Sequence, residues 1–275
     1  MNYEALDFEQ LLALAQEEPD DDGYGKYHWE CVFAVVARDS EATFAWLQSA
    51  LRRGDSECRF VCDVFGKLRE ANSPHSKTIA TLLIELLAEA DDQLVIGAII
   101  SALGHGEGEP RILQALLSQV THPYVMVRWH LIFGLGGYRE PEAVEALLTL
   151  ARDDDELVRD WALLKLRELK IDSPAIRAAF VHAMTDEDAM VREEALCGLA
   201  KLRDKRVVPA VLREIDEEGH SALFEQIAEH TPNYQLLPAL LEMAKDEGFL
   251  GDRAGLSKAI ERCEAYINRG IEHDN

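Results

Sequence analysis

A short phrase built around Val-Arg recurs along the middle of the chain at nearly constant spacing. Its three copies begin at Val127-Arg128, Val158-Arg159 and Val191-Arg192, so the arginines lie 31 and then 33 positions apart. A period of this length is typical of stacked repeats, because one such unit cannot bury its apolar face alone. We therefore expect functional residues on extended surfaces rather than in a single pocket.

The copies resemble the HEAT and HEAT-like repeat family. The resemblance includes an acidic residue six positions before the arginine, at Asp153 and Asp186, and covers roughly residues 108–203. The copy that contains Arg128 departs from the pattern, since His122 stands where the aspartate is expected. In the family each repeat is an antiparallel helix pair, and the Asp and Arg connect neighbouring repeats. The resemblance implies an architecture and no particular activity.

Apolar residues spaced by three and four, interrupted by Pro, Gly and Asp, predict helices along the whole chain. We predict an all-α protein, a right-handed α-solenoid of about eight antiparallel helix pairs that forms one HEAT-like repeat domain over residues 1–275. The pairs are expected near 5–38, 40–71, 74–104, 108–138, 141–170, 174–203, 205–230 and 235–268.

The chain is strongly acidic, with 51 Asp and Glu against 28 Lys and Arg and a formal net charge of −23. Its basic residues occur in short groups among acids, such as Lys201-Leu202-Arg203. Nucleic-acid and anionic membrane surfaces require a coherent basic face, so neither partner is expected. A basic protein is the natural complement of this charge. The alternative is that the acidity serves only solubility.

The expected location is the cytoplasm. The N-terminus lacks the basic start and apolar run of a secretory signal. No apolar stretch reaches the ~20 residues that cross a bilayer. Five cysteines are scattered without a paired framework, as is usual in a reducing compartment.

Adjacent acids fall in six of the eight predicted turns between paired helices. These are Asp20-Asp21-Asp22, Asp91-Asp92, Asp153-Asp154-Asp155, Asp186-Glu187-Asp188, Asp216-Glu217-Glu218 and Asp246-Glu247. In a solenoid such turns lie along one edge, so we expect an acidic ridge. Asp also caps helix N-termini, but capping accounts for one acid per turn more easily than for three. The docking candidates on this ridge are Asp153, Asp154, Asp186 and Asp188.

The second helix of each pair is expected to line the concave groove. At ~100° per residue, Val158, Ala162 and Leu166 share the buried side of their helix. The same register gives the groove candidates Trp129, Phe133, Asp160, Leu164, Arg167, Glu193 and Cys197, and, with a looser alignment, Phe60 and Val64. An exposed Trp and Phe one turn apart have the composition of a binding hot spot. The alternative is that curvature of the stack buries both rings.

Other motifs favour structural roles. The segment Tyr24-Gly25-Lys26-Tyr27-His28-Trp29 is expected to cap the open end of the stack, with a partner contact as the alternative. The segment Gly104-His105-Gly106-Glu107-Gly108 is expected to be a linker, and Cys58 and Cys62 to be buried thiols. Phosphate-cradle, dinucleotide and nucleophile-elbow signatures are absent. We therefore predict no catalytic residue, metal or cofactor.

These features favour a non-enzymatic interaction scaffold that binds a basic protein by its groove, its acidic edge or both. An antidote or immunity-type inhibitor of a basic toxin is one form of this hypothesis. The main alternative is a bilin lyase-like or chaperone-like HEAT-repeat protein, since some HEAT-like bacterial proteins attach or detach bilins. HEAT-like DNA glycosylases are disfavoured, because they need a basic concave face. The sequence leaves the partner and the oligomeric state open.

Overall fold

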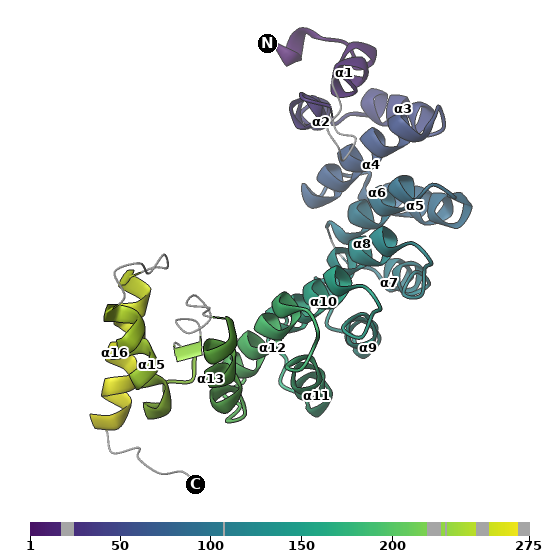
Figure 1. Ribbon diagram of the computed structural model, residues 1–275. Helices are drawn as coiled ribbons and strands as arrows, with labels where there is room; N and C mark the ends of the chain where they lie inside the picture. Colours follow the sequence, from purple (N-terminus) through teal and green to yellow (C-terminus); the bar gives the residue numbers. More distant parts are fainter. Residues whose placement is uncertain (18–24, 107, 219–226, 229, 246–252, 269–275) are drawn as a thin grey trace. The chain divides into compact units, whose positions relative to one another are not determined.

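The computed structural model describes residues 1–17, 25–106, 108–218, 227–228, 230–245 and 253–268 (Figure 1). These residues form helices joined by turns, with no strand among them, which confirms the predicted all-α helical-repeat class. The chain divides into two compact units, Met1–Leu150 (unit 1) and Ala151–Asn275 (unit 2). One continuous repeat domain over residues 1–275 stays a prediction.

Unit 1 consists of helix pairs that follow one another along the chain. It begins with the 3₁₀-helix η1 (Tyr3–Ala5). Its α-helices are α1 (Phe8–Ala15), α2 (His28–Val36), α3 (Glu41–Ala50), α4 (Asp55–Glu70), α5 (Ser76–Glu89), α6 (Gln93–Gly104), α7 (Pro110–Leu117), α8 (Val125–Leu135) and α9 (Pro141–Leu150). Each of the first four predicted pairs spans two of these helices. The fifth predicted pair has its first helix, α9, in unit 1 and its second helix in unit 2.

The second helices of unit 1 form its tightest layer. Helix α4 packs against α2 and α6, and α6 packs against α8, whereas α5, α7 and α9 contact one another sparingly. This close packing buries a wide face of α4. Phe60 and Val64 were expected to face the groove, but they are only 1% and 0% exposed, so that prediction is wrong. Their side chains belong to the core between neighbouring second helices.

Unit 2 continues with the same alternation. Its elements are α10 (Glu156–Glu168), α11 (Pro174–Ala183), α12 (Ala189–Lys201), α13 (Val207–Glu218), the 3₁₀-helix η2 (Tyr234–Leu236), α15 (Leu237–Lys245) and α16 (Arg253–Asn268). Helix α12 packs against both α10 and α11. Asp216, Glu217 and Glu218 were expected in a turn, but they form the last turn of α13, so that placement is wrong. The acidic groups at 20–22 and 246–247 lie outside the described residues.

Local chemistry sets where the helices of unit 2 begin. The carboxylate of Asp155 accepts hydrogen bonds from the backbone N–H groups of Leu157 and Val158 at the start of α10. Asp188 accepts one from Val191 N–H at the start of α12. These aspartates satisfy donors that have no partner within the helix.

Three helix ends share one backbone conformation. The residues that follow the C-caps of α4, α10 and α12 are Asn72, Lys170 and Arg203, with φ of 56°, 55° and 54°. This left-handed conformation ends many helices and is usually adopted by Gly. Lys170 and Arg203 are 33 positions apart, so the repeat extends to its terminating residue.

The valines of the recurring phrase lie at equivalent places in the core. Val127 in α8, Val158 in α10 and Val191 in α12 are each 0% exposed. Their equivalent burial was predicted from the repeat and is confirmed. None of the described helices is long and apolar enough to cross a membrane.

Candidate functional site

Arg159 connects two successive acidic turns of unit 2. Its Nη1 donates to the carbonyl oxygens of Asp153 and Asp154, at 2.9 and 3.2 Å. Its Nε and Nη2 donate to the two carboxylate oxygens of Asp186, at 2.9 and 2.7 Å. The guanidinium group therefore binds its own turn through the backbone and the next turn through a side chain. This confirms the predicted contact between Arg159 and the acidic turns.

The backbone half of this arrangement recurs at the other two arginines. In unit 1, Nη1 of Arg128 donates to the carbonyl oxygens of His122 and Pro123, at 2.8 and 3.3 Å. In unit 2, Nη1 of Arg192 donates to those of Asp186 and Glu187, both at 3.0 Å. Each arginine thus binds the residues six and five positions before it. His122 occupies the position at which the other two copies have Asp. It can still accept the bond from Arg128, because the acceptor is its backbone carbonyl oxygen.

Most acids of the two best-defined turns have structural partners. Oδ1 of Asp153 accepts from Asp155 N–H, and Oδ1 of Asp186 accepts from Asp188 N–H. Burial raises the pKa of Asp186, but the bonds from Arg159 and from the Asp188 N–H outweigh it and leave the pKa below its usual range. Asp154 is exposed. In each turn the first acid accepts a hydrogen bond within the turn, the second is exposed, and the third caps the following helix.

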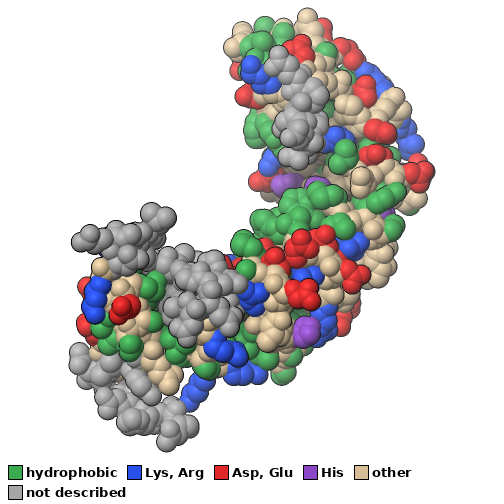
Figure 2. Space-filling model, viewed as in Figure 1, with side chains coloured by type: hydrophobic (Ala, Val, Ile, Leu, Met, Phe, Trp, Pro, Cys, Tyr) green, Lys and Arg blue, Asp and Glu red, His purple; other side chains and the backbone are tan. Residues whose placement is uncertain are grey.

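The groove candidates of unit 2 lie together on α10 and α12. Asp160, Leu164 and Glu193 are half-buried. Burial raises the pKa of the Asp160 carboxyl above its usual range; the charges of Asp188 and Glu193 raise it further, and the charge of Arg167 lowers it. In the same helices, Leu157 is 43% and Met190 62% exposed. Figure 2 shows acidic and basic side chains interleaved with apolar ones on the viewed face of unit 2.

A half-buried ion pair joins α10 to α12 beside this group. Nε of Arg167 donates to Oε1 of Glu194, and Nη2 donates to Oε2 at 3.0 Å. Burial raises the pKa of Glu194 to about 7, although Arg167 opposes the change. Cys197 was expected to face the groove, but it is buried, and burial raises the pKa of its thiol to about 12. The pair and the thiol fill the space between the two helices.

The aromatic candidates of unit 1 pack on each other. The rings of Trp129 and Phe133 on α8 are half-buried and meet edge to face, with centroids 4.7 Å apart. Trp29 and Phe33 on α2 are more exposed, at 42% and 54%. Nε2 of His28 lies 2.9 Å from a carboxylate oxygen of Asp63 on α4, so the described part of the N-terminal aromatic segment is held against a neighbouring helix.

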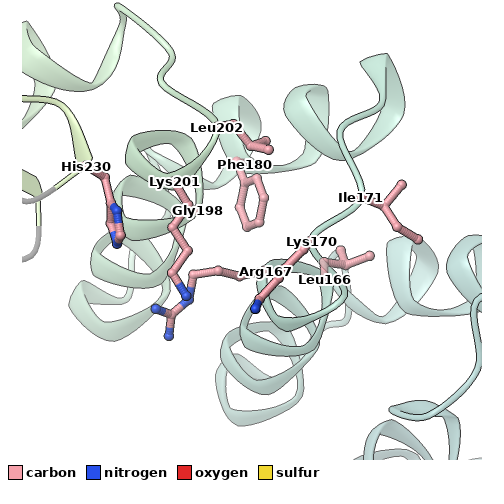
Figure 3. A pocket seen from close by; sticks show the side chains of 9 residues that line it. All are labelled: Leu166, Arg167, Lys170, Ile171, Phe180, Gly198, Lys201, Leu202 and His230. Carbon is pink, nitrogen blue, oxygen red and sulfur yellow. The ribbon is translucent and has the colours of Figure 1, made fainter.

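Unit 2 also contains a pocket that was not predicted. It has a volume of ≈ 550 Å³ and apolar walls at Leu166 and Phe180. Its cationic lining residues are Arg167, Lys170 and Lys201, and His230 also lines it. Figure 3 shows the ends of the Arg167, Lys170 and Lys201 side chains directed toward the same side of the pocket, with the Phe180 ring deeper between the helices. Arg167 and Lys170 are close in the sequence, but only the helix packing brings Lys201 and His230 to them.

The described residues show no cluster of three or more His, Cys, Asp or Glu side chains suited to a metal ion. The thiols of Cys58 and Cys62 are free and buried, and they lie one turn apart on α4. His105 Nδ1 lies 3.6 Å from a carboxylate oxygen of Glu70, and its carbonyl oxygen accepts a hydrogen bond from Arg69. These groups therefore contribute to packing and to the linker after α6.

Part of the sequence is similar to known helical-repeat proteins. Residues 79–167 match the family model of HEAT repeats. Protein YibA of Escherichia coli (strain K12) is 30% identical over 122 residues, and the same protein of Escherichia coli O157:H7 matches equally. The match covers 44% of this chain and 42% of each relative, so it spans less than half of either protein.

Solved structures extend the likeness along the chain at the level of fold. The X-ray structure of Escherichia coli YibA has a TM-score of 0.71 at 18% identity and covers 95% of this chain and 94% of its own. An engineered protein has a TM-score of 0.55 at 17% identity and covers 95% of this chain and 74% of its own. With the Val-Arg repeats and the alternating helices, these matches show HEAT repeats over residues 79–167 and the same helical-repeat fold along the chain.

Proposed function

We propose that the protein is a non-enzymatic scaffold that binds a basic segment of another protein on the α10–α12 face of unit 2. HEAT-repeat proteins are typically scaffolds rather than enzymes. The observation that carries the proposal is the environment of Asp160. Its half-buried carboxylate lies near the charges of Asp188 and Glu193, which disfavour its ionised form, and the charge of Arg167 offsets part of their effect. A lysine or arginine of a partner would relieve this repulsion.

The surroundings of Asp160 supply the apolar part of such a contact. Leu157 and Met190 are exposed on the same two helices, and Leu164 is half-buried. Apolar side chains next to a carboxylate suit a segment in which basic and apolar residues are mixed. The net charge of −23 would attract that segment from a distance and speed its association. An antidote that blocks a basic toxin is one form of this function.

The test uses a fluorescein-labelled peptide, Gly-Lys-Lys-Leu-Lys-Phe-Lys-Lys-Gly, titrated with the full chain. Asp160→Asn combined with Glu193→Gln should weaken binding about tenfold, because two charge pairs at a partly buried site are lost. The matched variant carries Asp154→Asn and Glu187→Gln, which remove the same charge from two exposed turn residues. It should bind within about twofold of the native chain.

Two results would contradict the proposal. If the turn variant lost affinity while the α10–α12 variant did not, the acidic ridge would be the binding surface. If both variants lost the same affinity, the net charge alone would attract the peptide. Circular dichroism and thermal unfolding of each variant show whether the fold is intact.

A further inference from the structure

The cationic pocket of unit 2 is one of two neighbouring hollows that share a residue. His230 lines the first pocket and also a second one of ≈ 700 Å³. The second pocket adds Arg203 and Lys205 to the cations, and the ring of Tyr266 to its wall. Cationic side chains therefore line both hollows from the end of α10 to the segment before α13. A lining of this length exceeds what one small anion can contact.

Two lysines of the first pocket, Lys170 and Lys201, have no ion pair with a described residue. Arg167 binds Glu194 through Nε and Nη2, and its Nη1 makes no hydrogen bond to a described residue. In a chain with 51 acids and 28 Lys and Arg, two lysines in one pocket without an ion pair are unexpected from composition.

The backbone at two of these cations gives a second, independent indication. Lys170 lines the first pocket and Arg203 the second, and both have the left-handed φ at which Gly is favoured. A non-Gly residue in this conformation costs about 1 kcal/mol or more, and the helix dipole, which favours a cation at a helix C-terminus, offsets ~0.3–1 kcal/mol of it. Asn72, in the same conformation after α4, shows that a cation is not needed to end the helix.

We propose that these two pockets bind an acidic segment of a protein partner. Its carboxylates would pair with Lys170, Lys201 and Arg203. An apolar side chain of the segment would enter the first pocket, between Leu166 and Phe180. The chemistry is opposite to that of the Asp160 face, so the two sites can be tested with different probes, and failure of one leaves the other unaffected.

The decisive variant carries Lys170→Gly and Arg203→Gly. Glycine removes both cations and also suits the left-handed backbone, so thermal stability should be unchanged or higher. The probe is a labelled peptide, Gly-Glu-Asp-Leu-Glu-Phe-Asp-Glu-Gly. Its affinity should fall about tenfold in this variant, and affinity for the native chain should weaken as salt rises. A purely structural role for the two residues would change stability but not this affinity.

Two matched controls isolate the effect. Asn72→Gly makes the same backbone change in unit 1 and should leave the affinity unchanged. Lys77→Gln with Lys258→Gln removes two exposed positive charges outside both pockets and should also leave it unchanged. The proposal is overturned if the native chain does not bind the acidic peptide, or if the charge control weakens binding as much as the glycine variant. It is also overturned if a short oligodeoxythymidine binds the pockets more tightly than the peptide, since phosphate would then be the preferred anion.

Discussion

Arg159 donates hydrogen bonds from Nε and Nη2 to the two carboxylate oxygens of Asp186, which lies 27 residues further along the chain. Its Nη1 donates to the carbonyl oxygen of Asp153, in the turn that precedes its own helix. The side chains of Arg159 and Asp186 are 17% and 14% exposed, so the pair is well shielded from water. A bidentate pair of this kind fixes geometry as well as contributing energy. It sets the position of one acidic turn relative to the next.

Asp186→Asn should lower the free energy of unfolding by ~1–3 kcal/mol, because Arg159 would lose its charged acceptor in a partly buried place. Chemical denaturation at neutral pH measures the change. Asp154→Asn, at an exposed residue of the preceding turn, should change it by less than ~0.5 kcal/mol. Equal effects of the two substitutions would contradict the connecting role of Asp186.

Val158→Ala should destabilise the protein by ~1–2 kcal/mol, since it removes two methyl groups from a fully buried position. The neighbouring Leu157 is 43% exposed, and Leu157→Ala should cost much less. Thermal and denaturant unfolding of both variants test the comparison. An unchanged unfolding curve for Val158→Ala would contradict the equivalence of the repeated valines.

Glu194 should make stability depend on pH near neutrality. Its pKa is raised to about 7 in the folded state, mainly by burial, whereas an unfolded glutamate has a pKa of ~4.3. Between these values the folded chain holds a proton that the unfolded chain has released, so stability falls as pH rises through this window. Glu194→Gln should flatten that dependence. Glu168→Gln, at an exposed residue of α10, should leave it as it is.

Gly198 is required by the packing of α11 on α12. A Cβ at this position would lie 2.4 Å from two carbon atoms of the Phe180 ring, which is 1% exposed. Gly198→Ala should therefore destabilise unit 2 by ~1–3 kcal/mol, despite the higher helix propensity of Ala. Gly137→Ala is the control, because a Cβ there would have no neighbour within 4 Å. Denaturant unfolding of both variants is the measurement.

The fold was predictable because the core repeats. Val127, Val158 and Val191 recur at a spacing that only a stacked architecture explains, and each is fully buried. The contacts of Arg159 were predictable for the same reason, since its acceptors keep a constant distance in sequence. Where the spacing was looser, as at Phe60 and Val64, the predicted face was wrong. There the burial depends on how closely α4 fits between its neighbours, which the sequence does not encode locally.

The cationic pocket could not be predicted from spacing. Lys170, Lys201 and His230 come from three separate segments of the sequence. Their proximity arises only when α12 packs against α10 and α11. The sequence held one indication of it. The residues that follow the C-caps of α10 and α12, Lys170 and Arg203, are cations at equivalent repeat positions. The electrostatic stress on Asp160 likewise depends on burial and on residues of another helix.

The uneven packing of unit 1 has a mechanical consequence. Its second helices are closely packed from α2 to α8, while α5, α7 and α9 touch one another sparingly. The layer of second helices should therefore resist deformation more than the layer formed by α5, α7 and α9. Small rotations between neighbouring repeats would then accumulate in this less resistant layer. Unit 1 should therefore bend by small rotations between repeats, with its second helices staying in contact.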